Sequence, residues 1–279
     1  MKTGLVLEGG GVRGIYTAGV LDVFLEHNLT FDGIVSVSAG AIHACSYLSK
    51  QHGRSLRYYK NYCQDPRFMG ISSWLKTGDI VGAKFCYDTI PNELDLYDYD
   101  TFLHNKTAFY VVCTNIETGK AEYFKLSDMK RDIDYMRASA SLPYFSKPVL
   151  LDGKQFLDGG CSDSIPLKAS EKIGYLRNVI VLTRDKDYVK KAEFSWLAKM
   201  VYRKYPKFVN ALLNRHLVYQ KQMEDVLRKE ASGEVFVIRP SQSLKIGRLE
   251  KNPEEVQRIY DLGRKDALSY MESLKEWFL

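Results

Sequence analysis

Short apolar runs alternate along this chain with longer stretches in which apolar residues recur at helical spacing. The runs at 5–7, 109–113 and 179–182 are apolar or aromatic without interruption, which is typical of strands in a parallel sheet that is covered on both faces. Val20 and Phe24 follow the first run at a spacing that predicts a helix. Strands that alternate with helices indicate an α/β fold, and we expect a mostly parallel central sheet.

The pattern changes in the last third of the chain. A late strand is expected at 235–238, and Asn252 followed by Pro253 is typical of the start of a helix, here a long terminal one. We therefore divide the chain into a catalytic core at 1–183 and an extension at 184–279, made of basic amphipathic helices, the late strand and the terminal helix. We expect the extension to pack on the core, so that the chain forms one domain overall.

A glycine-rich loop lies between the first predicted strand and the first predicted helix. Residues 8–14 read Glu-Gly-Gly-Gly-Val-Arg-Gly, and backbone N–H groups at such a helix start bind negative charge. The spacing of Gly9, Gly11 and Gly14 fits a dinucleotide-binding fingerprint, and the same amides equally suit a developing oxyanion. The fingerprint also requires an acid after the second strand, whereas Asp32 precedes that strand.

A serine among small residues follows the second predicted strand. The run at 32–41 reads Asp-Gly-Ile-Val-Ser-Val-Ser-Ala-Gly-Ala, so that Ser38 lies between a strand and a helix. This arrangement is typical of a nucleophile elbow, in which small neighbours allow the strand and the helix to meet at a sharp angle. Ala39 and Gly40 meet this requirement, and Ser36 stands where the elbow pattern has glycine. The alternative is that Ser38 only caps the helix.

A serine nucleophile needs a base, and the sequence offers a histidine and an aspartate. Of the five histidines, only His216 follows both Ser38 and a plausible acid, as in a Ser-Asp-His triad, but it lies inside a long helical pattern. Asp152 and Gly153 separate two strand-like runs and predict a hairpin turn. Asp158 ends the second run, before two glycines that allow another loop to approach closely, and is the better candidate for a functional acid.

Three short blocks of this sequence resemble the signature blocks of the patatin-like phospholipases, in the order of that family. They are Gly9–Gly14, Ser36–Gly40 and Asp158–Gly160, and the segment at 138–143 resembles the one that precedes the aspartate block. The resemblance runs from about residue 4 to about residue 183. It implies a three-layer αβα sandwich of the patatin type, here with a helical extension at the C-terminal end.

The resemblance also implies a role for each block. Ser38 is expected as the nucleophile and Asp158 as its base, in a Ser-Asp dyad that requires no histidine. The oxyanion hole is expected among the backbone amides of Gly9, Gly10, Gly11, Val12 and Arg13. The implied activity is hydrolysis of lipid acyl esters without a metal or cofactor. A nucleotide-binding or noncatalytic scaffold that uses the glycine loop, and a Ser-Asp-His hydrolase with His216, are the alternatives.

Composition narrows the remaining classes. The chain has 279 residues, 45% of them hydrophobic and 27% charged, which suits one large α/β domain. No apolar run is long enough for a membrane span, and the start of the chain lacks the features of a signal peptide. Five cysteines without CxxC spacing predict reduced thiols, no zinc site and a cytoplasmic location. The net charge of +6 does not indicate nucleic-acid binding, because the charge is concentrated in one region without a recognised module.

That region is the basic stretch at 186–229, which holds 11 lysines and arginines against four acids. Aromatic and apolar residues such as Trp196 and Met200 lie between the charges, and Pro206 separates two expected helices. A basic amphipathic helix lies well on an anionic bilayer, so we expect transient contact with the inner face of a membrane. The alternative is that these apolar residues pack on the protein's own sheet. Membrane contact and packing on the sheet could both occur if the two expected helices formed a mobile flap over the site.

Overall fold

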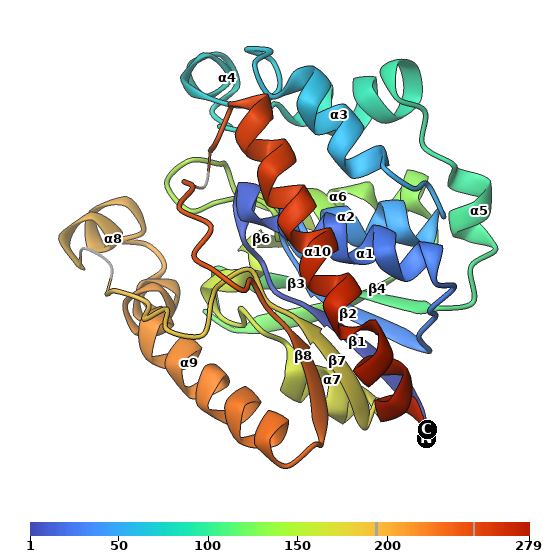
Figure 1. Ribbon diagram of the computed structural model, residues 1–279. Coiled ribbons are helices and arrows are strands. Elements are labelled where there is room, and N and C mark those ends of the chain that lie inside the picture. Colours follow the sequence, from blue (N-terminus) through green and yellow to red (C-terminus); the bar gives the residue numbers. More distant parts are fainter. Residues whose placement is uncertain (193–194, 248) are drawn as a thin grey trace.

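The computed structural model describes residues 1–192, 195–247 and 249–279. An eight-stranded sheet forms its centre, with the order β5-β6-β3-β2-β1-β7-β8 and β4 paired to β3 (Figure 1). Strands β3, β2, β1, β7 and β8 are parallel, which confirms the expected α/β fold. The strands are Thr3–Leu7 (β1), Gly33–Val37 (β2), Ala108–Asn115 (β3), Ala121–Leu126 (β4), Val149–Leu151 (β5), Lys154–Asp158 (β6), Arg177–Val181 (β7) and Val235–Ile238 (β8).

Helices cover both faces of this sheet and give the expected three layers (Figure 1). The α-helices are Ile15–Glu26 (α1), Ala39–Leu48 (α2), Arg54–Tyr62 (α3), Ile71–Thr77 (α4), Tyr99–Leu103 (α5), Met129–Ser139 (α6), Leu167–Ile173 (α7), Ser195–Val201 (α8), Pro206–Ala231 (α9) and Pro253–Phe278 (α10). Short 3₁₀ helices occur at Gly11–Gly14 (η1) and Gly159–Cys161 (η3), and a π-helix at Phe85–Leu94 (η2). Among the described residues, no helix combines the length and the apolar character needed to cross a bilayer.

The parallel strands are buried on both faces because their alternate side chains join different cores. Leu5 and Leu7 of β1 pack with residues of α1, α2 and α10 on one side. Val6 points to the other side and packs with Tyr219 and Val226 of α9. This burial explains why the first strand reads as an uninterrupted apolar run.

The structure contains the turn and the helix starts that short sequence patterns predict. Asp152 and Gly153 have φ angles of 49° and 77°, as in a type I′ turn, and join the antiparallel pair β5 and β6. Pro206 is in the first turn of α9. The Asn252 side chain accepts a hydrogen bond from the Glu254 N–H at 3.0 Å and caps α10.

The pairing partners of β3 bring two strand ends together. Val112 of β3 pairs with Val37, the last residue of β2, and the next residue, Cys113, pairs with Asp158, the last residue of β6. β4 pairs with both of these β3 residues from the other edge. Because a strand has only two edges, β2 and β6 share one edge of β3 and meet end to end. Ser38, which follows β2, therefore lies close to Asp158.

Helix α10 crosses α1 at two glycines (Figure 1). A Cβ on Gly19 would lie 2.2 Å from the Tyr260 carbonyl oxygen, and one on Gly263 would lie 2.1 Å from the Tyr16 carbonyl oxygen. Real Cβ atoms do not approach backbone this closely, so each glycine lets one helix backbone touch the other. The terminal helix therefore packs against α1 through direct contacts between the two backbones.

Replacing Gly263 with alanine should destabilise the fold, because the added methyl group forces α10 away from α1. We expect the free energy of unfolding to fall by about 1–3 kcal/mol, as for other overpacked sites, measured by urea unfolding followed by circular dichroism. Leu268→Ala, at an exposed position of the same helix, is the control and should unfold near the wild-type midpoint. A stable Gly263→Ala protein would mean that the two helices separate without cost.

Candidate active site

Ser38 has the backbone conformation of a strained turn. Its φ is 53° and its ψ is −121°, in a region that residues other than glycine rarely adopt. The turn is sharp because α2 begins at Ala39 directly against the glycine loop, where a Cβ on Gly40 would lie 2.8 Å from the Glu8 carbonyl oxygen. Ser38 is only 5% exposed. This conformation is the nucleophile-elbow geometry that the sequence predicts.

Ser36 fits the elbow although it replaces the usual glycine. The side chain is fully buried, and its hydroxyl donates to the Tyr110 carbonyl oxygen at 3.2 Å on the neighbouring strand. A serine at this position therefore keeps a hydrogen bond when it loses water.

Asp158 ends β6 beside Ser38, and its carboxylate is held by the turn that follows. Oδ1 accepts a hydrogen bond from the Gly160 N–H at 2.7 Å, and the Asp158 N–H donates to the Ser141 carbonyl oxygen at 2.8 Å. The turn can contact the backbone of β3 only with glycine at position 159, because a Cβ there would lie 2.1 Å from the Val112 carbonyl oxygen. The sequence predicts that these glycines allow another loop to approach closely; at Gly159 the close neighbour is instead strand β3.

The segment at 138–143 fixes both of these residues, a function that the sequence did not reveal. The Ser139 hydroxyl accepts a hydrogen bond from the Ser38 N–H at 2.9 Å and donates to the Val112 carbonyl oxygen at 2.7 Å. Ser141 holds the Asp158 backbone, as described above. Serines at the end of a helix have too many ordinary uses for this role to be recognised from the pattern alone.

The glycine loop lies against the elbow. A Cβ on Gly9 would be 3.2 Å from the Ser38 Cβ, and Gly11 has a φ of 57°, in the left-handed region. In the part of the chain that the structure describes, the N–H groups of Gly10 and Gly11 donate to no other protein group. Glu8, at the start of the loop, is buried and accepts hydrogen bonds from the Thr183 N–H at 2.6 Å and the Tyr219 hydroxyl at 2.9 Å.

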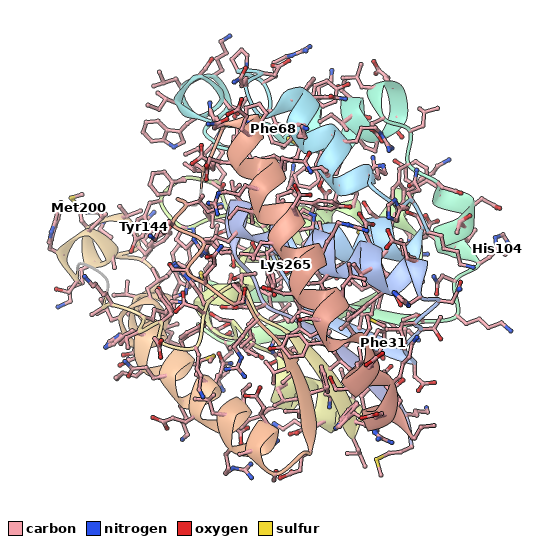
Figure 2. The ribbon with its side chains drawn as sticks, viewed as in Figure 1. Phe31, Phe68, His104, Tyr144, Met200 and Lys265 are labelled. Carbon is pink, nitrogen blue, oxygen red and sulfur yellow. The ribbon has the colours of Figure 1, made fainter. Side chains whose placement is uncertain are left out.

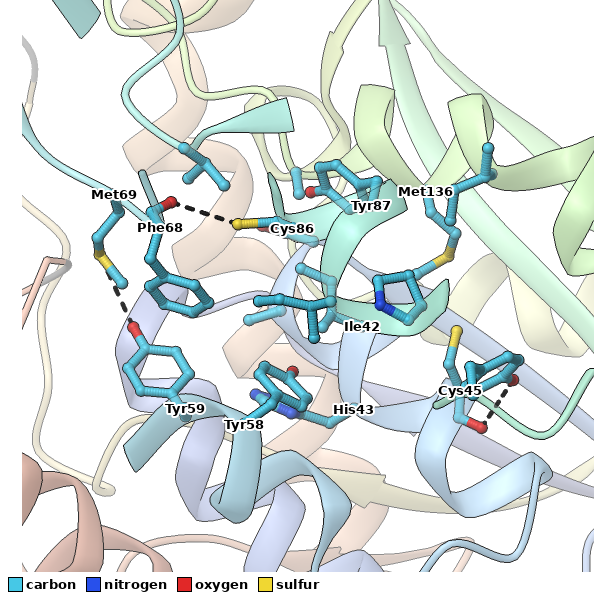
Figure 3. A pocket seen from close by; sticks show the side chains of 18 of the residues that line it. Ile42, His43, Cys45, Tyr58, Tyr59, Phe68, Met69, Cys86, Tyr87 and Met136 are labelled. Atoms are coloured by element: carbon cyan, nitrogen blue, oxygen red, sulfur yellow. Dashed lines mark hydrogen bonds between the residues drawn. The ribbon is translucent and has the colours of Figure 1, made fainter. Parts of the chain in front are cut away.

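Ser38 lines two cavities. The larger has a volume of about 170 Å³, extends between α2, α3, η2 and α6, and is lined mainly by apolar and aromatic side chains (Figure 3). The smaller, of about 30 Å³, is polar and brings Ser38 together with Asp158, Arg13 and the glycine loop. Gly11 and Leu142 also line both cavities. The predicted site residues therefore converge on one point, except that Val12 faces the apolar side.

The histidines and Asp32 occupy other places. His216 lines neither of the two cavities that contain Ser38. His43 lines the apolar cavity, where burial lowers its pKa to about 3. Asp32 accepts hydrogen bonds from the Thr3 N–H and hydroxyl at the opposite edge of the sheet, as predicted. Across the described residues, no group of three His, Cys, Asp or Glu side chains has a geometry that could hold a metal ion.

Comparisons with known proteins identify the family to which most of the chain is similar. A family model described as "Patatin-like phospholipase" matches residues 5–170, and a "Domain of unknown function (DUF6363)" matches 205–279. The uncharacterized protein YjjU of Escherichia coli is 29% identical over 185 residues, which cover 65% of this chain and 52% of YjjU. Lysophospholipase nte1 of Aspergillus niger is 30% identical over 180 residues, which cover 62% of this chain and 11% of that protein.

The chain thus spans about half the length of YjjU and about a ninth of the fungal protein. Among solved structures, the crystal structure of VipD from Legionella pneumophila aligns with a TM-score of 0.47 at 12% identity, covering 98% of this chain and 67% of that chain.

His43 should make the stability of the protein depend on pH. Its pKa is lowered from 6.5 to about 3 on folding, so below pH 6.5 the unfolded chain takes up a proton that the folded chain does not. This contribution is fully present above pH 6.5 and is lost as the pH falls towards 3. His43→Leu should therefore flatten the acid side of the stability curve, by up to about 1.4 kcal/mol per pH unit, in urea unfolding at a series of pH values.

His104→Leu is the matched control, because the His104 side chain is 73% exposed. This variant should keep the wild-type slope between pH 6.5 and 4. Equal slopes for wild type and His43→Leu would contradict the lowered pKa of His43.

Proposed function

Because the chain belongs to the patatin-like phospholipase family, we propose that it is a serine hydrolase of lipid acyl esters in which Ser38 is the nucleophile and Asp158 its base. The observation that carries this proposal is the end-to-end meeting of β2 and β6 on β3, which brings both side chains to one cavity. A strained serine, an aspartate beside it and free backbone amides opposite are the parts that acyl transfer needs.

The chemistry follows from these parts. The Ser38 Oγ attacks the ester carbonyl carbon while Asp158 accepts the hydroxyl proton. The carbonyl oxygen becomes an oxyanion, which the N–H groups of Gly10 and Gly11 stabilise. The bond to the leaving alcohol then breaks, and Asp158 returns the proton to that alcohol. Water repeats the sequence on the acyl-serine and releases a fatty acid.

The apolar cavity supports a long acyl chain as the group that Ser38 transfers. Figure 3 shows Ile42, Tyr58, Phe68 and Met136 around the space that begins at the elbow. The free energy of binding becomes more favourable by about 0.8 kcal/mol for each methylene that the apolar walls remove from water. The cavity therefore favours a fatty acyl group over a short acyl group. The fungal relatives are named lysophospholipases, so an ester with a single acyl chain is the first substrate to test.

A dinucleotide suits the site less well. The space beside the glycine loop is about 30 Å³, whereas sites for ligands of that size occupy roughly 300–1,000 Å³. The residue that follows the second strand is also a serine, Ser38, where the fingerprint requires the ribose-binding acid.

Contact with a membrane is supported by an exposed apolar surface next to the site. α8 exposes Trp196 and Met200 to 63% and 59%, and Met200 lies at the outer edge of the molecule (Figure 2). α4 exposes Ile71 and Leu75, both to 73%. Of the two expectations for the basic stretch, packing on the protein applies to α9, whose Phe208 and Leu212 are fully buried, and exposure applies to α8.

The loop at 142–147 connects this surface to the cavities. The Tyr144 N–H donates to the Tyr202 hydroxyl at 2.8 Å, next to α8, and the Phe145 carbonyl accepts from the Ile80 N–H at 2.7 Å, next to α4. Exposed basic residues accompany α8, at Lys199, Arg203, Lys204 and Lys207. An apolar surface bordered by cations suits an anionic bilayer, from which the acyl chain would enter.

Reaction with a fluorophosphonate tests the nucleophile. Intact mass and peptide mapping should find one adduct, on Ser38, because an activated serine attacks this reagent as it attacks an ester. Ser38→Ala should remain folded and unlabelled. Failure of the folded wild-type protein to react would reject the hydrolase.

Two further variants test the base in the same assay and in hydrolysis of a single-chain acyl ester. Asp158→Asn should lower turnover by about 10²–10⁴, because it removes the proton acceptor. His216→Ala should keep the wild-type rate. If Asp158→Asn were active, or if His216→Ala were folded but inactive, the base would be a residue other than Asp158 alone and the dyad would be rejected.

Vesicle sedimentation tests the membrane surface. Leu75→Ser and Trp196→Ser should each weaken binding to vesicles that contain an anionic phospholipid by about fivefold to tenfold, because each removes apolar area from the bilayer. Leu176→Ser is the control. Leu176 is 60% exposed, but it precedes β7 and so lies at the end of the sheet where the parallel strands begin, whereas Ser38 lies at the end where they finish. If all three variants bound the vesicles equally well, α4 and α8 would not form the membrane-binding surface.

A further inference from the structure

Glu8, the first residue of the glycine loop, ties this loop to the end of β7. It is buried, and its N–H donates to the Val181 carbonyl oxygen at 3.1 Å. The Thr183 N–H donates to Glu8 Oε2 at 2.6 Å, and the Thr183 hydroxyl lies 3.2 Å from both that oxygen and the Gly9 carbonyl oxygen. A Cβ on Gly10 would lie 2.8 Å from the same hydroxyl oxygen. The backbone of the loop therefore follows the position of the Glu8 side chain and its partners.

Tyr219 of α9 supplies the hydrogen bond to the other oxygen of the Glu8 carboxyl group. Its hydroxyl donates to Oε1 at 2.9 Å, and its ring is buried in one cluster with Val6 and Ile180 of the sheet. A buried ring has little freedom to move, so its hydroxyl fixes the direction of the carboxyl group. Without this donor, one buried oxygen would lose its hydrogen bond, and the loop would have to shift to bring it to another donor or to water.

Gln222, one turn further along α9, holds the segment that follows Asp158. Its Nε2 donates to Asp163 Oδ1 at 2.5 Å. The Asp163 N–H in turn donates to the Gly159 carbonyl oxygen at 2.9 Å, inside the turn that holds the Asp158 carboxylate. Tyr219 and Gln222 are three residues apart and so share one face of the helix. One face of α9 is therefore bonded to both the glycine loop and the Asp158 turn.

Helix α9 lies outside the part of the chain that matches the patatin-like model. That model matches residues 5–170, whereas α9 falls within the stretch at 205–279 that matches a domain of unknown function. The bonds of α9 to the site therefore do not follow from the match to the patatin-like model.

From these bonds we infer that α9 positions the reacting groups, with Tyr219 as a positioning residue that acts through Glu8 on the loop whose amides bind the oxyanion. Gln222 acts in the same way on the turn that holds Asp158. This inference rests on the proposed hydrolase function, and it gives the C-terminal region a part in the reaction.

A positioning role has a kinetic signature. The oxyanion exists only in the transition state, so a displaced loop lowers kcat and leaves KM nearly unchanged. A displacement of about 1 Å can lower the rate about 100-fold. A substitution that only weakened the fold would instead lower the free energy of unfolding and leave the turnover of the folded molecules as it was.

Tyr219→Phe tests this role, because it removes the hydroxyl and keeps the ring. We expect kcat for a single-chain acyl ester to fall by about 10- to 100-fold, with KM within about twofold of wild type. The rate constant for labelling of Ser38 by a fluorophosphonate should fall by a similar factor, since the phosphoryl oxygen of the reagent needs the same amides. Wild-type kcat and labelling in Tyr219→Phe would overturn the inference.

Tyr260→Phe is the matched control. The buried Tyr260 hydroxyl donates to the Asp22 carboxylate at 2.6 Å, so the substitution removes the same kind of hydrogen bond, here between α10 and α1. This variant should lose stability in urea to a similar extent and keep the wild-type kcat. If kcat fell equally in both variants, the effect would follow stability, and the positioning role would be rejected.

Glu8→Gln tests whether Tyr219 acts through Glu8. Alone, it should lower kcat, because one of the two donors to the carboxyl group would then face an amide N–H₂. Combined with Tyr219→Phe, the single amide oxygen still accepts the Thr183 N–H, so the double variant should be no slower than Tyr219→Phe. Residues that act through one contact do not have independent effects. If the two reductions in kcat multiplied, Tyr219 would not act through Glu8.

Gln222→Met tests the second contact, because methionine keeps the length of the side chain without its donor. We expect kcat to fall about tenfold with KM unchanged, through displacement of the Asp158 turn. A wild-type kcat would overturn the role of Gln222.

The wild-type protein separates this inference from the proposed function. A folded wild type that neither hydrolyses the ester nor reacts with the fluorophosphonate would reject the hydrolase, and the positioning role with it. If wild type and Tyr219→Phe were labelled on Ser38 at the same rate, the hydrolase would stand and the positioning role alone would be rejected.

Discussion

The geometry of the site depends on the pairing of β3 with two strands along one edge. β2 runs along that edge as far as Val112, and β6 continues it from Cys113. A shift of either strand by one residue would turn its side chains to the opposite face and separate Ser38 from Asp158. Ser139 and Ser141 reinforce this register from α6, because one binds the backbone of the serine and the other that of the aspartate. Backbone pairing, more than the position of any helix, decides where Ser38 and Asp158 lie.

The last third of the chain completes the core that the first part begins. Tyr219 of α9 fills one face of the sheet and reaches Glu8 at the start of the glycine loop. On the other face, α10 and α1 exchange two buried hydrogen bonds, from the Tyr16 hydroxyl to Asp266 at 3.0 Å and from the Tyr260 hydroxyl to Asp22 at 2.6 Å. These bonds flank the contacts at the two glycines. The last third of the chain therefore contributes to the packing on both faces of the sheet.

Most of the secondary structure was predictable because its signals are local. Asp152 with Gly153, Pro206 and Asn252 each determine the backbone within a few residues, and the structure confirms all three. The three-layer fold followed from the motifs, and the end-to-end strand contact did not, because register is a relation between residues far apart in the chain. The cavities and the bond from Tyr219 to Glu8 were unpredictable for the same reason: residues that are distant in sequence form them together. The sequence also left the basic stretch undivided, although α8 exposes Trp196 and Met200 whereas Phe208 and Leu212 of α9 are buried.

Attachment to one strand has a consequence for motion. Val37, which precedes Ser38, and Asp158 itself pair with adjacent positions of β3, and the hydroxyl of Ser139 links the elbow to that same strand. A movement of β3 would therefore displace the two side chains together. The loop at 142–147 is tied instead to α4 and α8 at the surface. A swing of those two helices on a bilayer would reshape the entrance while the reacting pair keeps its alignment.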